Sequence, residues 1–127
     1  NMIGAEFLPQ ISIIPKVDLV ITHGGNNTTT ESVHFGKPMI VLPLFWDQYD
    51  NAQRMHEIGF GVRLATYAFT EAEMNSALDS LLSDEALGKK MRENAAQIQS
   101  RDGLGVASAL IEKVALVFPT EIIFEIS

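Results

Sequence analysis

The segment from Leu19 to Arg54 constrains the fold of this chain more than any other part of its sequence. It begins with a short apolar and β-branched run, residues 19–22 (LVIT), and it contains a second apolar run, residues 39–42 (MIVL). Continuous apolar runs of this length are typical of strands that are buried on both faces of a parallel sheet. A polar stretch that suits a helix separates the two runs, so the segment predicts a strand–helix–strand unit.

The residues around these runs predict the rest of the sheet. A helix is expected over residues 28–35, because Gly36 and then Pro38 follow it in the usual order of helix stop signals. A second helix is expected over residues 49–58 and a third short strand over residues 61–64. This alternation of helices and buried strands indicates an α/β fold, a Rossmann-like parallel sheet with flanking helices and right-handed crossovers.

The two ends of the chain are predicted to differ. Before the sheet, residues 2–7 are a candidate strand and residues 10–14 a short helical turn. After the sheet the chain is expected to be helical, since Thr70 and Glu73 form the Thr-x-x-Glu pattern of a capping box. Two apolar stripes at helical spacing follow: Met74, Ala77, Leu78 and Leu81, then Leu87, Met91, Ala95 and Ile98.

The boundaries of the last two helices are predicted from their capping signals. Ser83 is expected to cap the second of the two striped helices, with Asp84 and Glu85 at its positive end. Gly103 and Gly105 are expected to interrupt the helical run, so that a last helix covers residues 107–117.

Composition limits the classes of function. A chain of 127 residues suits one domain with a real core. Its formal net charge of −7 argues against nucleic acid or an anionic membrane as the main partner. The chain has no cysteine, which excludes disulfide and thiolate chemistry and is compatible with the cytoplasm, the expected location. The longest apolar runs, residues 11–15 and 38–46, are too short for a membrane segment.

Two polar clusters follow the two buried runs directly. His23, Gly24 and Gly25 come after the first run and lead into the polar stretch 26–30 (NNTTT). The second run is followed by residues 43–48 (PLFWDQ). Because ligands of parallel sheets bind beyond the carboxyl ends of the strands, both clusters are expected at the same edge of the sheet.

The first cluster has the chemistry of an anion site. Gly24 and Gly25 allow positive φ and the close approach of a ligand, and the polar stretch after them begins a helix with free N–H groups. His23 is placed to donate to a phosphate oxygen. On the residues alone, a simple turn with a helix cap and a structural histidine explain the pattern equally well.

The side chains that follow suit sugar hydroxyls. Glu31 can face the same edge and accept two hydrogen bonds from a ribose diol, or it can complement the helix dipole. Asp47 and Gln48 offer acceptors and donors for hydroxyl groups, although Asp47 can equally cap the next helix. Trp46 is expected to pack rather than to stack on a ligand. The spacing of the three histidines fits no usual zinc motif.

Between Phe7 and Asn51, several short elements occur in a characteristic order and spacing. They are Pro9-Gln10, His23-x-Gly25, Asn27-Thr28, Glu31, Gly36-x-Pro38, Pro43, Asp47-Gln48 and Asn51-Ala52. This pattern resembles the donor-binding signature of the UDP-glycosyltransferase superfamily, the family 1 glycosyltransferases with the GT-B fold. The signature covers about a third of the chain, and the following helices resemble the remainder of the same domain.

The resemblance implies a role for each residue that matches. Phe7 stands where the family usually has a tryptophan and would stack on the nucleobase with a smaller area. Gln10 would contact the base or the ribose, and Glu31 would hold the ribose hydroxyls. The diphosphate would be bound by His23, Gly25, Asn27 and Thr28. Hydroxyl groups of the donor sugar would be bound by Asp47 and Gln48.

The resemblance also implies a reaction and a division of labour. The whole enzyme would be an inverting glycosyltransferase that moves a hexose from UDP or TDP to an acceptor hydroxyl. The nucleotide sugar is a substrate, and neither a cofactor nor a metal is expected, because His23 and the helix terminus would stabilise the leaving diphosphate.

No catalytic residue is expected in this chain. The general base, a histidine, would lie in an acceptor-binding domain that precedes Asn1 together with the first half of the donor domain. Residues 1–118 would then be the C-terminal part of the donor-binding domain and residues 119–127 a tail, and the chain alone is expected to be inactive. Alternatives are a nucleotide-sugar 2-epimerase, a cell-wall N-acetylglucosaminyl transferase and a non-catalytic nucleotide-binding module.

Overall fold

Three short parallel strands form the centre of the computed structural model, which describes residues 2–117. They are β1 (Val20–Thr22), β2 (Met39–Val41) and β3 (Gly61–Arg63), in the order β1-β2-β3. Two helices make the crossovers, α2 (Asn26–His34) and α3 (Asp47–Glu57). The predicted Rossmann-like α/β fold is confirmed. The predicted tail, residues 119–127, lies outside the described residues.

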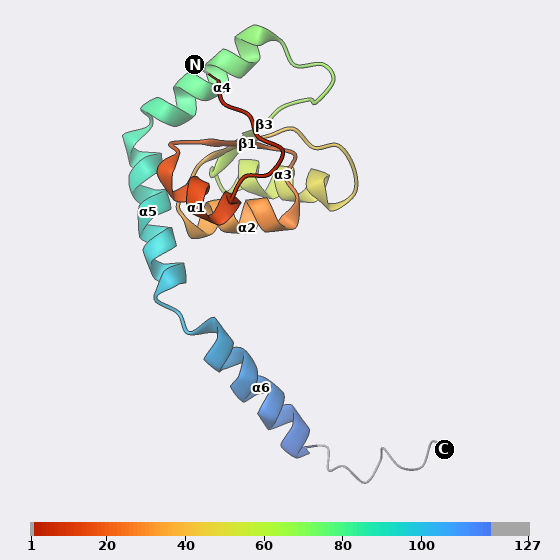
Figure 1. Ribbon diagram of the computed structural model, residues 1–127, viewed down its shortest axis with the longest axis vertical. Helices are drawn as coiled ribbons and strands as arrows, with labels where there is room; N and C mark the ends of the chain where they lie inside the picture. The colour runs from red at the N-terminus through yellow and green to blue at the C-terminus, as the bar shows by residue number, and fades with distance from the viewer. Residues whose placement is uncertain (1, 118–127) are drawn as a thin grey trace, which may run out of the picture.

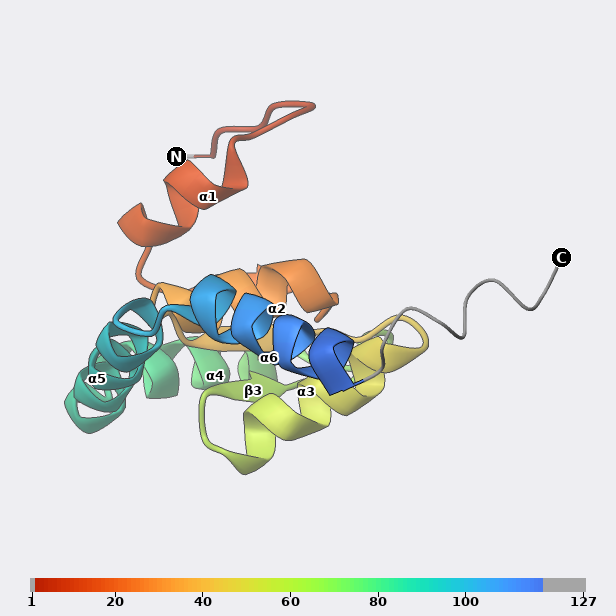
Figure 2. The ribbon, with the colours of Figure 1, turned by 90° about the horizontal axis from the view of Figure 1, so that it is seen from below.

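The helices form layers around this sheet. Figure 1 shows α2 and α3 on one side of the sheet and α4 (Glu71–Ser83) on the other. The next helix, α5 (Glu85–Gln99), packs against α2. The last helix, α6 (Gly103–Val117), extends away from the sheet in Figure 1. A short helix, α1 (Gln10–Ile13), and a 3-10 turn (Ile14–Lys16) lead into β1 and stand apart from the other layers in Figure 2. Within residues 2–117, no helix is long and apolar enough to cross a membrane.

The core of the protein is centred on β2. Met39, Ile40 and Val41 are completely buried, as predicted for a strand covered on both faces. The same prediction is wrong for β1, because the side chain of Ile21 is 51% exposed. Among the described strands only β2 pairs with β1, so β1 lies at an edge of the sheet where less of the structure covers it.

The N-terminal strand prediction is also wrong. Within the described residues, positions 2–7 are exposed and form no strand, because none of the three strands takes them as a partner. The predicted helical turn at residues 10–14 is confirmed by α1 and the start of the 3-10 turn.

Aspartates, rather than the predicted residues, set the starts of the last two helices. Asp84 caps α5 by accepting a hydrogen bond from the Leu87 N–H at 2.8 Å, whereas Ser83 ends α4 and donates to the Asp79 carbonyl. The Asp102 carboxylate accepts from the Gly105 N–H at 2.9 Å. This cap satisfies an otherwise free N–H group, which explains why α6 begins at Gly103 and not at residue 107.

Gly36 ends α2 and is in direct contact with α5. Its φ is +66°, and a Cβ there would lie 2.8 Å from the Met91 carbonyl oxygen. Gly59, with φ of +72°, ends α3 in the same way, but a Cβ there would meet nothing within 4 Å. A side chain at Gly36 would therefore meet both backbone strain and a steric clash, whereas a side chain at Gly59 would meet backbone strain alone.

We expect Gly36→Ala to lower the free energy of unfolding by about 2–4 kcal/mol, from left-handed strain plus the clash with Met91. Gly59→Ala is the matched control and should cost about 1–2 kcal/mol, from strain alone. Urea denaturation of both variants measures the difference. Equal losses would show that α5 does not pack on the end of α2 as described.

The predicted capping box at the start of α4 is confirmed. The Glu73 carboxylate accepts from the Thr70 N–H at 2.7 Å and from the Thr70 hydroxyl at 2.8 Å, and the Glu73 N–H donates to that hydroxyl oxygen at 3.2 Å. The backbone hydrogen bond from Thr70, followed by the side-chain bond, lowers the pKa of Glu73 below its ordinary value of 4.5.

A carboxylate whose pKa is lowered by folding stabilises the fold above its unfolded pKa and loses that contribution as the pH falls through the folded pKa. The difference in stability between wild type and Glu73→Gln should therefore be largest above pH 4.5 and shrink below it. Urea midpoints measured from pH 7 to pH 3 test this. Glu71→Gln, at the first position of α4, controls for the helix dipole, and a difference that does not depend on pH would contradict the assignment.

Candidate functional site

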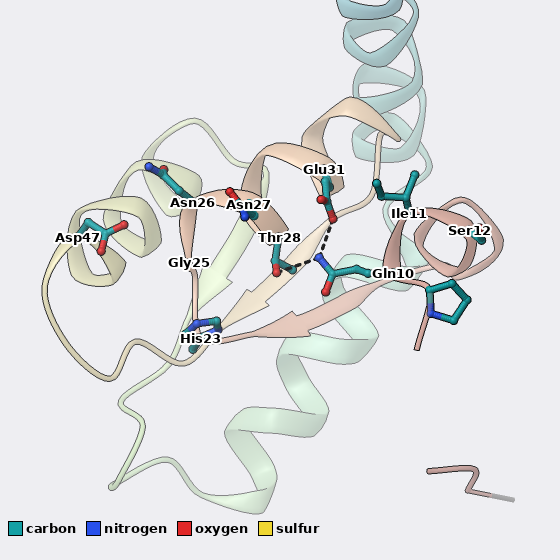
Figure 3. A pocket seen from close by; sticks show the side chains of 11 residues that line it. Gln10, Ile11, Ser12, His23, Gly25, Asn26, Asn27, Thr28, Glu31 and Asp47 are labelled. Atoms are coloured by element: carbon teal, nitrogen blue, oxygen red, sulfur yellow. Dashed lines mark hydrogen bonds between the residues drawn. The ribbon is translucent and has the colours of Figure 1, made fainter. Parts of the chain in front are cut away.

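An open pocket of about 820 Å³ lies where α1, the end of β1 and the starts of α2 and α3 meet. Figure 3 shows the side chains that line it. They are Pro9, Gln10, Ile11, Ser12, His23, Gly25, Asn26, Asn27, Thr28, Glu31 and Asp47. Most of the residues predicted to bind a ligand are thus brought together, and the two polar clusters do share one edge of the sheet.

The two glycines after His23 have different roles. Gly24 has φ of +87°, and a Cβ there would lie 2.6 Å from Val41 Cγ1, so both the conformation and the packing require glycine. Gly25 has φ of −63°, so the expectation of a positive φ is wrong at this position. A Cβ on Gly25 would lie 3.0 Å from His23 Nε2. Gly25 therefore leaves room for the imidazole ring beside the start of α2.

The start of α2 presents free backbone donors. The helix begins at Asn26, two residues earlier than predicted, and Gly25 occupies the N-cap position. A glycine has no side chain to cap the first N–H groups, which also lack partners within the helix. The Asn/Thr-rich stretch lies inside the helix instead of capping it. These donors and the exposed His23 side chain make this part of the pocket suitable for an anion.

On one side of this part of the pocket, Gln10 links α1 to α2. Its amide nitrogen donates to the Glu31 carboxylate at 2.6 Å and to the Thr28 hydroxyl at 3.1 Å (Figure 3). Glu31 is not in the first turn of α2, so complementing the helix dipole does not explain its position. A carboxylate has about four acceptor sites, so Glu31 retains the capacity to accept hydrogen bonds from a diol.

Asp47 lines the pocket from the start of α3. It is the first residue of that helix, and Trp46 is in the N-cap position, so the alternative that Asp47 caps α3 is wrong. The prediction for Trp46 is wrong as well. Its side chain is 86% exposed, its φ is +51°, and its ring meets the edge of Phe45 at a centroid distance of 5.6 Å.

Phe7 and Gln48, which were predicted to bind the donor, are outside the pocket. Phe7 is 87% exposed, in the irregular segment before α1. Gln48 is buried, and its side-chain oxygen accepts from the N–H groups of Leu44 at 2.9 Å and Phe45 at 3.2 Å. The structure thus gives Gln48 a role in supporting the loop between β2 and α3.

Some residues of the site were not predicted from the sequence. Ile11 and Ser12 line the pocket because they follow Gln10 directly in α1. Asn51 was noted only as part of a motif, but its amide reaches the Gly24 carbonyl oxygen at 2.9 Å. The signal for Asn51 is its spacing, since it lies one helical turn after Asp47.

Along the pocket, a group of hydrogen-bond donors lies between two carboxylates. The N-terminus of α2 supplies positive character in the middle, next to the His23 ring, and the carboxylates of Glu31 and Asp47 flank them on either side (Figure 3). Among residues 2–117, no three His, Asp or Glu side chains are grouped so that they could hold a metal ion. The arrangement can bind a ligand with an anionic centre and hydroxyl groups on both sides of it.

The fold is that of known glycosyltransferases. The chain is similar to the crystal structure of the glycotransferase of kitacinnamycin, with a TM-score of 0.77 and 28% sequence identity, over 84% of this chain and 28% of that one. The sequence matches the model of the family described as "UDP-glucoronosyl and UDP-glucosyl transferase" over residues 1–100. The chain belongs to this family.

Curated relatives agree with this assignment. The chain is 32% identical over 112 residues to the NDP-glycosyltransferase YjiC of Bacillus subtilis (strain 168), a match that covers 88% of this chain and 29% of the relative. It is 36% identical over 102 residues to UDP-glucuronosyltransferase 1A9 of Homo sapiens, covering 79% of this chain and 18% of the relative. The chain therefore spans less than a third of the length of these relatives.

We expect Gln48→Ala to lower the free energy of unfolding by about 2 kcal/mol, because two loop N–H groups lose their acceptor and a buried side chain is removed. Gln53→Ala, on an exposed position of the same helix, is the matched control and should change stability by about 0.5 kcal/mol or less. Thermal and urea denaturation give both values. If Gln48→Ala were as stable as the control, the loop-supporting role would be wrong.

Proposed function

We propose that this chain binds a nucleoside-diphosphate sugar, a UDP- or TDP-hexose, and forms the donor half of an inverting glycosyltransferase. The observation that carries the proposal is the order of groups across the pocket. Glu31 and Gln10 lie on one side, the uncapped start of α2 and His23 lie in the middle, and Asp47 lies on the other side. A nucleotide sugar has the same order of ribose diol, diphosphate and sugar hydroxyls.

The nucleoside end is assigned to Glu31 and Gln10. The Glu31 carboxylate can accept hydrogen bonds from both ribose hydroxyls, and its bond to Gln10 holds it in place at 2.6 Å. The side-chain amide oxygen of Gln10 adds an acceptor for the base or the ribose. The names of two relatives, an NDP-glycosyltransferase and a UDP-glucuronosyltransferase, support a nucleotide as part of the donor.

The diphosphate is assigned to the start of α2. Backbone N–H groups of the first turn, the Thr28 hydroxyl and the His23 side chain surround this part of the pocket. In the transition state, negative charge develops on the leaving diphosphate as the bond to the anomeric carbon breaks. Fixed donors at that position stabilise the charge without reorganisation.

The sugar is assigned to Asp47, whose carboxylate accepts hydrogen bonds from hydroxyl groups. A deprotonated acceptor hydroxyl would attack the anomeric carbon from the face opposite the diphosphate, which inverts the configuration at that carbon. The base that takes the proton from the acceptor is assigned to a part of the enzyme outside residues 1–127. The chain alone is therefore proposed to bind the donor without transferring it.

Isothermal titration calorimetry with UDP and with TDP tests the assignment. Wild type should bind, and His23→Ala and Glu31→Ala should each raise the dissociation constant about tenfold or more, as expected when a charge-assisted hydrogen bond is lost. His56→Ala and Glu112→Ala, at exposed positions on α3 and α6, are the matched controls and should bind like wild type. Unchanged binding by both site variants would refute the donor site.

A further inference from the structure

The side chain of Asn51 connects the two polar clusters of the pocket. Asn51 lies in the second turn of α3 and is half-buried. Its amide nitrogen is 2.9 Å from the Gly24 carbonyl oxygen, 3.3 Å from Asp47 Oδ2 and 3.5 Å from Asn26 Oδ1. One side chain on α3 therefore contacts the loop that leads into α2 and the carboxylate that begins α3.

The number of donors decides which contacts matter. An amide NH2 group has two hydrogens, which can be directed to the Gly24 carbonyl and the Asp47 carboxylate at the same time. The contact with Asn26 is at the outer limit of hydrogen-bond length and is the weakest of the three. The bond to Gly24 joins parts of the chain that are 27 positions apart, whereas the bond to Asp47 lies within one helix.

The positions of Gly24 and Asp47, the two partners of Asn51, determine the geometry of the pocket. Gly24 is buried, and its left-handed turn sets where the first N–H groups of α2 point. Asp47 is exposed at the first position of α3, where its side chain is otherwise free to change rotamer. Holding both at once fixes the spacing between the anion-binding end of α2 and the Asp47 carboxylate.

We propose that Asn51 is a positioning residue for the donor, coupling the site of the diphosphate to the site of the sugar. This inference rests on the proposed function, because it assigns the two contacts of Asn51 to two parts of one ligand. Asn51 acts through Gly24 and Asp47 and does not line the pocket itself. Aspartate at this position has the same shape but donates no hydrogen bond, and it adds a negative charge next to Asp47.

The test compares a ligand without a sugar with one that has a sugar. UDP and UDP-glucose are titrated into wild type, Asp47→Ala, Asn51→Asp and the double variant. Asp47→Ala should raise the dissociation constant of UDP-glucose about tenfold and leave that of UDP nearly unchanged. Asn51→Asp should weaken the binding of UDP a few-fold and the binding of UDP-glucose by a further factor of about ten. The reason is that the hydrogen bonds to Gly24 and to Asp47 are both lost.

The double variant separates positioning from general damage. If Asn51 acts on the sugar through Asp47, the double variant should bind UDP-glucose much better than the product of the two single effects predicts. If the effects multiply and Asn51→Asp weakens both ligands equally, Asn51 is only structural and the inference is wrong. Asn75→Asp, on an exposed position of α4, controls for the added net charge and should bind like wild type. Asn51→Ser adds no charge next to Asp47, so its cycle with Asp47→Ala should show the same non-multiplicative effect, and a multiplicative result there overturns the inference.

Folding and the underlying function are checked separately. Asn51→Ser keeps one donor and should recover part of the UDP-glucose affinity, and circular dichroism verifies that each variant is folded. If neither Asn51 variant folds, stability alone explains the residue and the inference is overturned. If wild type binds no UDP, the proposed function fails and the inference falls with it. If wild type binds and Glu31→Ala does not, but the Asn51 effects multiply, only the inference fails.

Discussion

The parallel pairing of β1 with β2 is the constraint on which the rest of the structure depends. The pairing aligns Thr22 with Val41, so both strands end at the same level, and the Leu42 N–H extends the pairing by donating to the Thr22 carbonyl at 2.9 Å. Each polar cluster begins just after its strand. The turn at Gly24 then packs directly on Val41, which gives the start of α2 a fixed position relative to the core.

The local electrostatic field in the pocket, and not the net charge of the chain, determines whether this acidic protein can bind an anion. The formal net charge of −7 is a sum over the whole chain, and solvent and salt screen exposed charges that lie more than about 10 Å from the pocket. In the pocket, the nearest groups to the middle are backbone N–H dipoles at the start of α2 and the His23 ring. The two carboxylates flank this position, so in the proposed function they face hydroxyl groups and not phosphate oxygens.

Much of this arrangement could be predicted from the sequence, because it depends on local patterns. The apolar runs predicted β1 and β2, stop signals predicted the ends of α2 and α3, and strand order placed His23 and Asp47 at one edge. What the sequence could not predict depends on tertiary contacts. Gln48 is a polar residue beside an exposed one, and only the folded loop shows that its side chain accepts two backbone hydrogen bonds. The prediction that β1 is buried on both faces was wrong for the same reason. The apolar run of β1 resembles that of β2, so the sequence does not show which of the two strands lies at the edge of the sheet.

The two ends of the pocket are built with different rigidity, and this difference bears on what the site can accept. The part proposed to bind the diphosphate rests on the buried strand β2, on the turn at Gly24 and on the bond from Asn51. The end proposed to bind the nucleoside rests on α1, where Gln10, Ile11 and Ser12 are exposed and where Ile14, just after the helix, is buried. Two hydrogen bonds from Gln10 hold α1 against α2. Because preorganised donors are most valuable where charge develops, the better-buried part of the pocket is the part that suits the leaving diphosphate of the proposed reaction.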